Sequence, residues 1–150
     1  MHVREAVLAD VPAIHQLLEG YAARGNLLPR TRENVQKFVR DFLIAEENGA
    51  LLGAGALEIM GADLGEIRSL VVDETQHGRG VGRQISLALM DEARALGLAR
   101  IMALTYVPKF FESLGFEVVE VDRLPEKVWQ VCVNCYKFQK CDEIAVLRRL

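Results

Sequence analysis

A strongly β-forming strand runs directly into a glycine-dense turn and then a long helix, and this feature constrains the fold most. The segment Leu70–Gly82 has the sequence LVVDETQHGRGVG, and helical periodicity follows from about Val81 to Leu96. Glycine lets the backbone turn tightly and approach a ligand, and it stands here at Gly78, Gly80 and Gly82. Free N–H groups at the helix start, with the helix dipole behind them, predict a site for phosphate or pyrophosphate. A solvated turn without a ligand is the alternative.

Two arginines add positive charge to this turn, at Arg79 and Arg83. The turn lacks the G-x-G-x-x-G pattern of dinucleotide-binding folds. It also lacks the Gly-Lys-Ser/Thr sequence of a P-loop. The pattern therefore favours an anion site of neither of these two types.

The order of predicted elements defines the fold class. Asn48-Gly49 predicts a hairpin, Asp10 and Thr31 are candidate helix N-caps, and glycines at Gly53 and Gly55 indicate a bulge or a close backbone approach. Strands are expected at His2–Ala6, Phe42–Glu46, Ala50–Met60, Glu66–Val72, Arg100–Leu104, Phe116–Val121 and Glu143–Leu147. Helices are expected after Asp10, after Thr31, over Val81–Leu96 with Ile85, Leu89, Ala93 and Leu96 on one face, over Lys109–Leu114 and, as a turn or two, over Pro125–Cys135. Hairpins come first and strand–helix–strand units later, so we expect an α/β fold with a mixed sheet.

Composition narrows the class of protein further. The 150 residues fit one domain, and no linker interrupts them. A net charge of −3 disfavours non-specific nucleic-acid binding. The longest uncharged run, Asn48–Leu57, is about half of the roughly 20 apolar residues that a membrane-spanning helix needs. The three cysteines are clustered, and no secretion signal precedes them, so we expect a soluble, cytoplasmic protein with no membrane partner.

The glycine-dense turn resembles the acetyl-coenzyme A signature of the GNAT acetyltransferase superfamily, Gln/Arg-x-x-Gly-x-Gly/Ala, with His77 in place of the first Gln or Arg. The resemblance implies a GNAT-like fold with a splayed central sheet and acetyl-CoA as co-substrate. It places the pyrophosphate on the amides of Gly78–Gly82 and the pantetheine arm on the backbone of Leu70–Val72. We expect His77 to alter side-chain contacts without loss of binding. The predicted coenzyme-binding residues are Leu70, Val71, Val72, His77, Gly78, Arg79, Gly80, Val81, Gly82, Arg83, Phe110 and Phe111.

A second segment, Phe110–Phe116, resembles the superfamily motif Phe-Tyr-x-x-x-Gly-Phe near the thiol end of the coenzyme. The usual tyrosine, a candidate acid for the departing thiolate, is Phe111 in this chain. A phenyl ring cannot donate that proton. Water, Tyr106 at the end of the preceding strand, or departure as an unprotonated thiolate are the three alternatives.

Glu66 is the candidate general base, because many members of the superfamily place a catalytic carboxylate at this position. A carboxylate acting through a water could deprotonate the attacking amine, so direct transfer would need no covalent enzyme intermediate. Strand alternation predicts that Glu66, Arg68, Leu70 and Val72 share one face. A cross-strand salt-bridge ladder that includes Glu66 and Arg68 is the structural alternative.

The segments Leu27–Arg32 and Leu124–Trp129, with the cysteine-containing tail, resemble the short bacterial N-acetylglutamate synthases. That resemblance implies acetylation of the α-amine of L-glutamate, which opens arginine biosynthesis. Glutamate carries two carboxylates, so its site needs cationic side chains, preferably arginines. The candidates are Arg30, Arg32, Arg68 and Lys127. Alternatively, Arg30 and Arg32 are solvated in a first helical turn, where positive charge is unfavourable.

The cysteines have the spacing Cys132-x2-Cys135-x5-Cys141, and the first pair has the spacing of a zinc knuckle. No His or Cys follows Cys141, so Asp142 or a water would have to be the fourth zinc ligand. Reduced structural thiols and reversible Cys132–Cys135 oxidation are the alternatives.

Two other functions stay open at this point. One is acetylation of another small amine, such as a polyamine, or of a protein N-terminus. The other is a non-catalytic acyl-coenzyme A sensor. The sequence also leaves a homodimer open.

Overall fold

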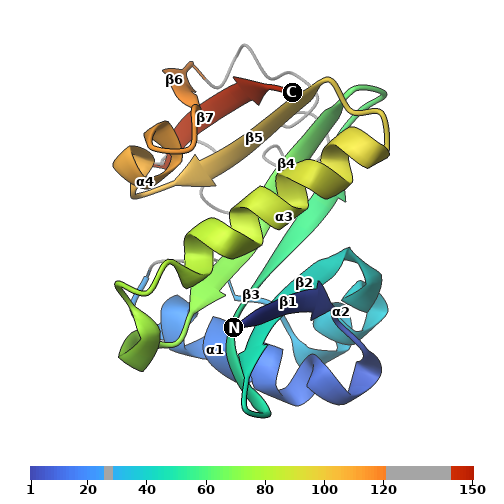
Figure 1. The fold of residues 1–150 in the computed structure, drawn as a ribbon, viewed down its shortest axis with the longest axis vertical. Helices are drawn as coiled ribbons and strands as arrows, with labels where there is room; N and C mark the ends of the chain where they lie inside the picture. Colours follow the sequence, from blue (N-terminus) through green and yellow to red (C-terminus); the bar gives the residue numbers. More distant parts are fainter. Residues whose placement is uncertain (26–28, 121–142) are drawn as a thin grey trace. The chain divides into compact units, whose positions relative to one another are not determined.

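The computed structural model describes residues 1–25, 29–120 and 143–150 (Figure 1). Within these residues, seven strands form one mixed sheet in the order β1-β2-β3-β4-β5-β7-β6. The strands are β1 (His2–Glu5), β2 (Phe42–Glu47), β3 (Ala50–Ile59), β4 (Leu64–Val72), β5 (Arg100–Thr105), β6 (Glu117–Val119) and β7 (Ile144–Arg149). The helices are α1 (Val11–Ala23), α2 (Arg32–Lys37), α3 (Val81–Ala95) and α4 (Pro108–Glu112), with short 3-10 turns η1 (Leu8–Asp10), η2 (Val39–Asp41) and η3 (Glu74–Gln76). The predicted α/β class with a mixed sheet is confirmed.

The chain divides into two compact units. The first contains Met1–Leu57 and Ile67–Asp91, and the second contains Glu58–Glu66 and Glu92–Leu150. Each unit is described separately below. No helix among the described residues is long and apolar enough to cross a membrane.

In the first unit, β2 pairs with β1 and with β3, in both cases antiparallel. The predicted hairpin turn is confirmed: Asn48 and Gly49 have φ of 53° and 80°, as the favoured two-residue hairpin turn requires. Helices α1 and α2 pack against one face of these strands (Figure 1). The apolar core between them contains Val11, Ile14, Leu18, Val35, Phe42, Ile44, Ala54, Ala56 and Val71.

Helix α3 packs on the other face of β3, where two glycines make room for it. A Cβ atom on Gly53 would lie 2.8 Å from the main-chain oxygen of Val71 and 3.0 Å from Val81 Cγ1. A Cβ on Gly55 would lie 3.0 Å from Ile85 Cγ2. The expected close backbone approach is therefore confirmed at Gly53, where the pairing of β2 with β3 also shifts in register, whereas Gly55 is approached by side chains.

Three of the four residues expected on the buried face of α3 are buried, namely Ile85, Leu89 and Ala93. The prediction for Leu96 is wrong, because this side chain is 57% exposed. The helix ends at Ala95, and Gly97 then turns the chain with a φ of 87°. Leu96 thus lies beyond the last helical turn, outside the buried stripe.

In the second unit, β4 pairs in parallel with β5, from Leu64–Arg100 to Glu66–Met102. Strand β7 pairs antiparallel with β5 and with β6, and the three strands lie side by side in Figure 1. Their core contains Met60, Leu64, Met102, Val119, Ala145 and Leu147. The observed ends of the predicted strands and helices differ by up to two residues from expectation, while the expected Pro125–Cys135 turn lies outside the described residues.

The two predicted N-caps have different outcomes. Thr31 Oγ1 accepts a hydrogen bond from Asn34 N at 3.0 Å, so this cap of α2 is confirmed. The Asp10 side chain does not cap α1. Its carboxylate instead accepts from Val7 N at 2.8 Å and from both terminal nitrogens of Arg4, at 2.9 and 3.0 Å. Asp10 is the last residue of η1 and has helical backbone angles (φ −82°, ψ −16°), so it lacks the extended backbone of an N-cap residue, which explains the wrong prediction.

Candidate functional site

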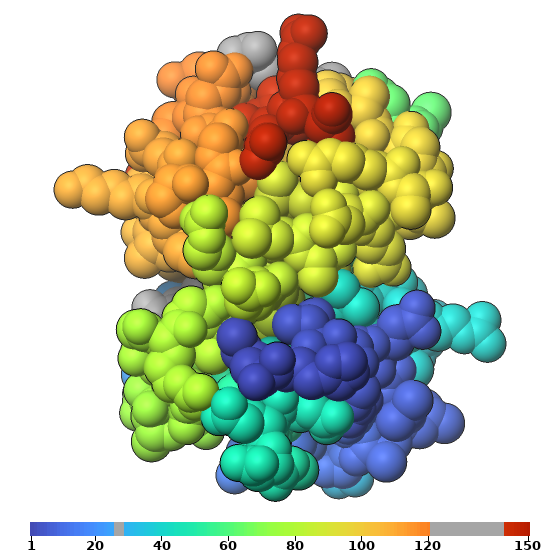
Figure 2. Space-filling model, viewed as in Figure 1, coloured from blue at the N-terminus to red at the C-terminus, as the bar shows by residue number. Residues whose placement is uncertain are grey.

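The turn between β4 and α3 presents main-chain amides that the helix cannot satisfy. The first helical hydrogen bond is donated by Gln84 N to Gly80 O at 3.0 Å, so the amides of Val81, Gly82 and Arg83 precede it. Gly78 and Gly80 have φ of 85° and 79°. A Cβ atom on either would meet nothing within 4 Å, so open space adjoins the turn. The turn, yellow-green in Figure 2, lies at the surface. Open space beside amides that have no partner within the helix fits the pyrophosphate of a coenzyme.

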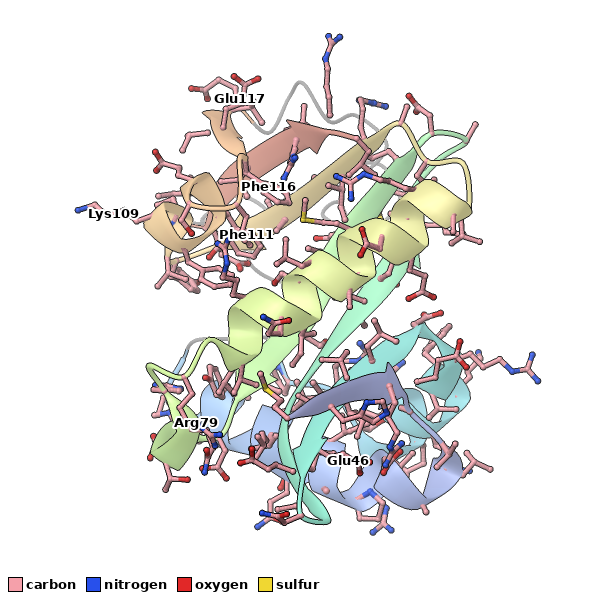
Figure 3. All side chains as sticks on the ribbon, in the orientation of Figure 1. Glu46, Arg79, Lys109, Phe111, Phe116 and Glu117 are labelled. Carbon is pink, nitrogen blue, oxygen red and sulfur yellow. The ribbon has the colours of Figure 1, made fainter. Side chains whose placement is uncertain are left out.

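Arg79, labelled in Figure 3, has two side-chain partners. Its Nη2 lies 2.9 Å from Glu47 Oε2, and its Nη1 donates to Gln76 Oε1. The hydrogen bond from the Arg79 guanidinium to the Glu47 carboxylate holds the pKa of Glu47 below its ordinary value. Arg83 is exposed in the first turn of α3. The positive charge at the turn is therefore partly balanced by Glu47 of the hairpin.

A tyrosine that the sequence analysis did not select ties the turn to the end of β4. Tyr21 Oη lies 3.0 Å from Val72 O, 3.2 Å from Val72 N and 3.1 Å from His77 Nε2. His77 Nε2 also lies 3.2 Å from Val72 O. The imidazole of His77 is thus folded back onto the strand.

Strand β4 contains one residue in the left-handed region, Ser69, with φ of 54°. Such a backbone is uncommon outside glycine and costs on the order of 1–3 kcal/mol unless neighbouring contacts hold it. The left-handed backbone at Ser69 interrupts the regular alternation of side chains along β4. The prediction that Glu66, Arg68, Leu70 and Val72 share one face assumed that this alternation continues through position 69. Leu70 is near α3, since its Cδ1 lies 3.1 Å from the Cβ position of Gly55, whereas Val71 belongs to the core under α1 and α2.

Arg30 is held beside this part of β4 by three contacts. Its Nη1 donates to Ser69 Oγ at 2.9 Å, and its Nε donates to Asn34 Oδ1 at 2.7 Å. Its guanidinium carbon lies 5.2 Å from the centre of the Phe42 ring. Arg68, the residue before Ser69, is half-buried in β4. The structure therefore brings Arg30 to the strand that carries Arg68.

Glu66 is buried, with 2% of its surface exposed, and it forms the last parallel pair between β4 and β5, with Met102. Tyr106 directly follows β5 and is half-buried. The candidate base and the candidate acid thus both belong to the second unit.

Phe111 lies in the core of the second unit, with 4% of its surface exposed. Its ring centre is 5.0 Å from that of Phe110 and 5.2 Å from that of Phe116, edge to face in both cases. Figure 3 shows Phe116 near Phe111 of α4, while the side chain of Lys109, also in α4, points away from them. Aromatic packing therefore accounts for a phenyl ring at position 111.

Three other predictions have simpler outcomes. Arg32 is the first residue of α2 and is exposed. Lys127 and the three cysteines, Cys132, Cys135 and Cys141, lie outside the described residues. Among residues 1–25, 29–120 and 143–150, no group of three or more His, Cys, Asp or Glu side chains is placed to hold a metal ion.

Sequence reasoning missed four side chains that shape the site: Tyr21, Asn34, Glu47 and Ser69. Asn34 is only four residues from Arg30, but Arg30 precedes the helix, so helical spacing did not predict their contact either. The contacts of Tyr21 and Ser69 join residues 51 and 39 positions apart. No local sequence pattern predicts contacts between residues so far apart in the chain.

Comparisons with known proteins agree with this architecture. The model of the acetyltransferase (GNAT) family matches residues 12–116. An uncharacterised N-acetyltransferase of Chlorobaculum tepidum is 38% identical over 99% of this chain and 96% of its own length. An amino-acid acetyltransferase of Mycobacterium tuberculosis is 36% identical over 89% of this chain and 78% of its own length.

Two solved structures are similar over almost the whole chain. One is a Mycobacterium tuberculosis protein in complex with CoA, with a TM-score of 0.86, 31% identity and coverage of 100% of this chain and 99% of that one. The other is the N-acetylglutamate synthase of Neisseria gonorrhoeae with coenzyme A and N-acetyl-glutamate, with a TM-score of 0.90 and 31% identity. The match covers 99% of this chain but 35% of the synthase.

The chain therefore belongs to the GNAT family of acetyltransferases. It is an N-acetyltransferase that uses acetyl-CoA, and its relatives include amino-acid acetyltransferases.

Proposed function

We propose that this enzyme acetylates the α-amine of L-glutamate by direct transfer from acetyl-CoA. The observation that carries the proposal is the fixed position of Arg30, whose guanidinium is oriented by Asn34 and Ser69 beside the strand that contains Arg68. Two arginines at one strand suit an acceptor with two carboxylates, because guanidinium groups bind carboxylates in a bidentate manner. The name of one solved relative, N-acetylglutamate synthase, supports the same acceptor, and the name amino-acid acetyltransferase supports an amino acid as acceptor.

The coenzyme is proposed to place its pyrophosphate on the turn from Gly78 to Gly82. This placement is supported by the unsatisfied amides at the start of α3 and by the open space at Gly78 and Gly80. Its pantetheine arm would follow Leu70–Val72. Both main-chain groups of Val72 already contact Tyr21, so Leu70 would supply most of the main-chain hydrogen bonds to the arm.

Glu66 is the proposed general base. A neutral amine is required for attack, and the buried carboxylate on β4 would accept the amine proton through a water. The amine nitrogen then attacks the thioester carbonyl carbon, the new C–N bond forms, the nitrogen loses its second proton to water and the C–S bond breaks. A main-chain amide of β4 would stabilise the charge on the carbonyl oxygen. The proton for the departing thiolate would come from water or Tyr106, unless the thiolate leaves unprotonated.

Acetylation of glutamate would place the enzyme at the first step of arginine biosynthesis, in the cytoplasm. Acetylation of another amino acid is the second candidate. It is supported by the relative from Mycobacterium tuberculosis that is named amino-acid acetyltransferase, because this name states no particular acceptor. The solved structure with CoA from the same organism has 31% identity to this chain. A polyamine acceptor would need an acidic lining, which the two arginines do not provide.

Release of free thiol from acetyl-CoA tests the proposal with a panel of acceptors. Comparing glutamate with glutamine measures the contribution of the side-chain carboxylate. Comparing glutamate with aspartate measures how much the distance between the two carboxylates matters. Ornithine and spermidine test cationic acceptors. We expect kcat/KM to be highest with L-glutamate. A higher value with glutamine or spermidine would replace glutamate as the acceptor while leaving the acetyltransferase assignment intact.

A further inference from the structure

One hydroxyl group, that of Tyr21 in α1, connects two other segments of the first unit. Its oxygen lies within hydrogen-bonding distance of both main-chain groups of Val72, at 3.0 Å from O and 3.2 Å from N. The same oxygen lies 3.1 Å from Nε2 of His77. A single side chain therefore joins a helix, the last residue of β4 and the first residue of the HGRGVG turn.

Strand geometry shows which main-chain groups the Tyr21 hydroxyl satisfies. Asp73 N donates to Leu52 O of β3 at 2.8 Å, so Asp73 faces β3. Main-chain groups of successive residues point to opposite edges of a strand, so those of Val72 point away from β3. Tyr21 satisfies both of them with one oxygen atom. Phenylalanine could satisfy neither.

His77 links the Tyr21 hydroxyl to the glycine-dense turn. The residue directly precedes Gly78, and the glycines that follow can adopt many backbone conformations. Ordering such a turn on ligand binding costs conformational entropy, and a turn that is already ordered avoids that cost. The contacts of the His77 ring with Val72 O and Tyr21 Oη hold the start of the turn against β4.

We propose that Tyr21 is a positioning residue for the coenzyme, and that it acts through Val72 and His77. In this arrangement the turn is held in the conformation in which the amides at the start of α3 meet the pyrophosphate. The inference rests on the proposed placement of the pyrophosphate on this turn. It goes further in assigning a role to a helix residue that the turn motif does not contain.

Tyr21→Phe removes only the hydroxyl. Loss of one or two hydrogen bonds predicts that the Kd of CoA, measured by calorimetry, rises about 3- to 10-fold. The KM of acetyl-CoA should rise by a similar factor, while kcat at saturating acetyl-CoA stays unchanged. Acetyl-pantetheine, which lacks the pyrophosphate, should show no change in KM, whereas a general loss of structure would weaken both donors.

A double-mutant cycle tests whether Tyr21 acts through His77. His77→Ala should raise the Kd of CoA, and the Tyr21→Phe/His77→Ala double variant should show less than the product of the two single effects, because both residues belong to one cluster. Thr31→Val is the matched control. It also deletes a hydroxyl with a structural hydrogen bond, the cap of α2, and should leave the Kd of CoA unchanged.

Three results would overturn the proposal: tighter or unchanged binding of CoA by Tyr21→Phe, equal losses with acetyl-CoA and acetyl-pantetheine, or single effects that multiply in the double variant. Failure of the underlying placement is recognised in the wild-type enzyme itself. If wild-type enzyme binds CoA no better than pantetheine, the pyrophosphate does not use this turn, and the role of Tyr21 falls with it.

Discussion

Arg30 Nη1 lies 2.9 Å from Ser69 Oγ, so the residue that precedes the N-cap of α2 is hydrogen-bonded to the left-handed residue of β4. The contact has two consequences. It contributes to holding a backbone conformation that serine adopts at a cost, and it fixes one edge of a guanidinium that we propose for the acceptor. The two consequences can be measured separately.

Ser69 variants report the first consequence. Ser69→Ala deletes the hydroxyl and keeps the strained φ, so we expect the free energy of unfolding to fall by about 1 kcal/mol. Ser69→Gly also deletes the hydroxyl but adopts this φ without strain, so it should lose less. Urea unfolding of both variants checks the order. A glycine variant less stable than the alanine variant would contradict the strain at Ser69.

Arg30 variants test the proposed role of this guanidinium in binding the acceptor. Arg30→Met should raise the KM of the anionic acceptor about 10- to 100-fold, the range expected for loss of hydrogen bonds to a charged group, with little change in the KM of acetyl-CoA. Arg30→Lys should recover only part of this loss, because lysine lacks the planar fork. Steady-state kinetics with each substrate varied in turn gives both constants. Arg40→Met, at an exposed arginine of η2, is the control, and an equal effect there would remove Arg30 from the acceptor site.

Glu66→Gln tests the proposed base. The amide keeps the shape of the side chain but cannot accept the amine proton, so kcat should fall about 100-fold or more, in the range typical of general-base catalysis. Binding of CoA, measured by calorimetry, should not change. A variant with nearly normal kcat would show that Glu66 is only a structural carboxylate of β4.

Two glycines form a matched pair for stability. A Cβ on Gly53 would lie 2.8 Å from the main-chain oxygen of Val71, so Gly53→Ala should cost about 1–3 kcal/mol, as overpacked positions do. A Cβ on Gly20, inside α1, would meet only Arg24 Nη2 at 3.9 Å. Gly20→Ala should therefore stabilise by up to about 1 kcal/mol, since alanine favours the helix. Thermal unfolding that shifted the same way in both variants would contradict this contrast.

Acid should weaken the first unit through Asp10. The side-chain hydrogen bond from Arg4, supported by the amide of Val7, holds the pKa of the Asp10 carboxyl below its ordinary value of 3.8. A lowered folded-state pKa contributes stability above the ordinary value, and this contribution is lost as the pH falls through the folded-state value. Asp10→Asn should therefore be less stable than wild type near neutral pH, with the difference shrinking below about pH 4. Chemical denaturation across this pH range measures it, and a constant difference would exclude the linkage.

Local rules predicted much of the fold from sequence. The cap at Thr31 and the hairpin at Asn48-Gly49 depend on residues close together in the chain, and both are present. The failures have physical reasons as well. Asp10 ends the 3-10 turn η1 with a helical backbone, so it does not have the extended conformation that an N-cap residue needs. Leu96 lies one residue past the end of its helix, where periodicity no longer assigns a face.

The candidate site was predictable only where its chemistry is local. The glycine turn and the carboxylate at Glu66 could be selected from motifs. The partners that orient Arg30 and His77 could not, because Ser69 and Tyr21 are brought to them by the fold over 39 and 56 positions of the chain.

The absence of a side chain at Gly53 also bears on how this lineage can change. A single methyl group there would meet a main-chain oxygen, and a main chain cannot swing aside as a flexible side chain can. Any descendant with a larger residue at this position must first displace the main chain of β4 at Val71, in the stretch of strand that we propose to hold the pantetheine arm. Variation at one interior atom is thereby tied to the affinity for a ligand that never touches it.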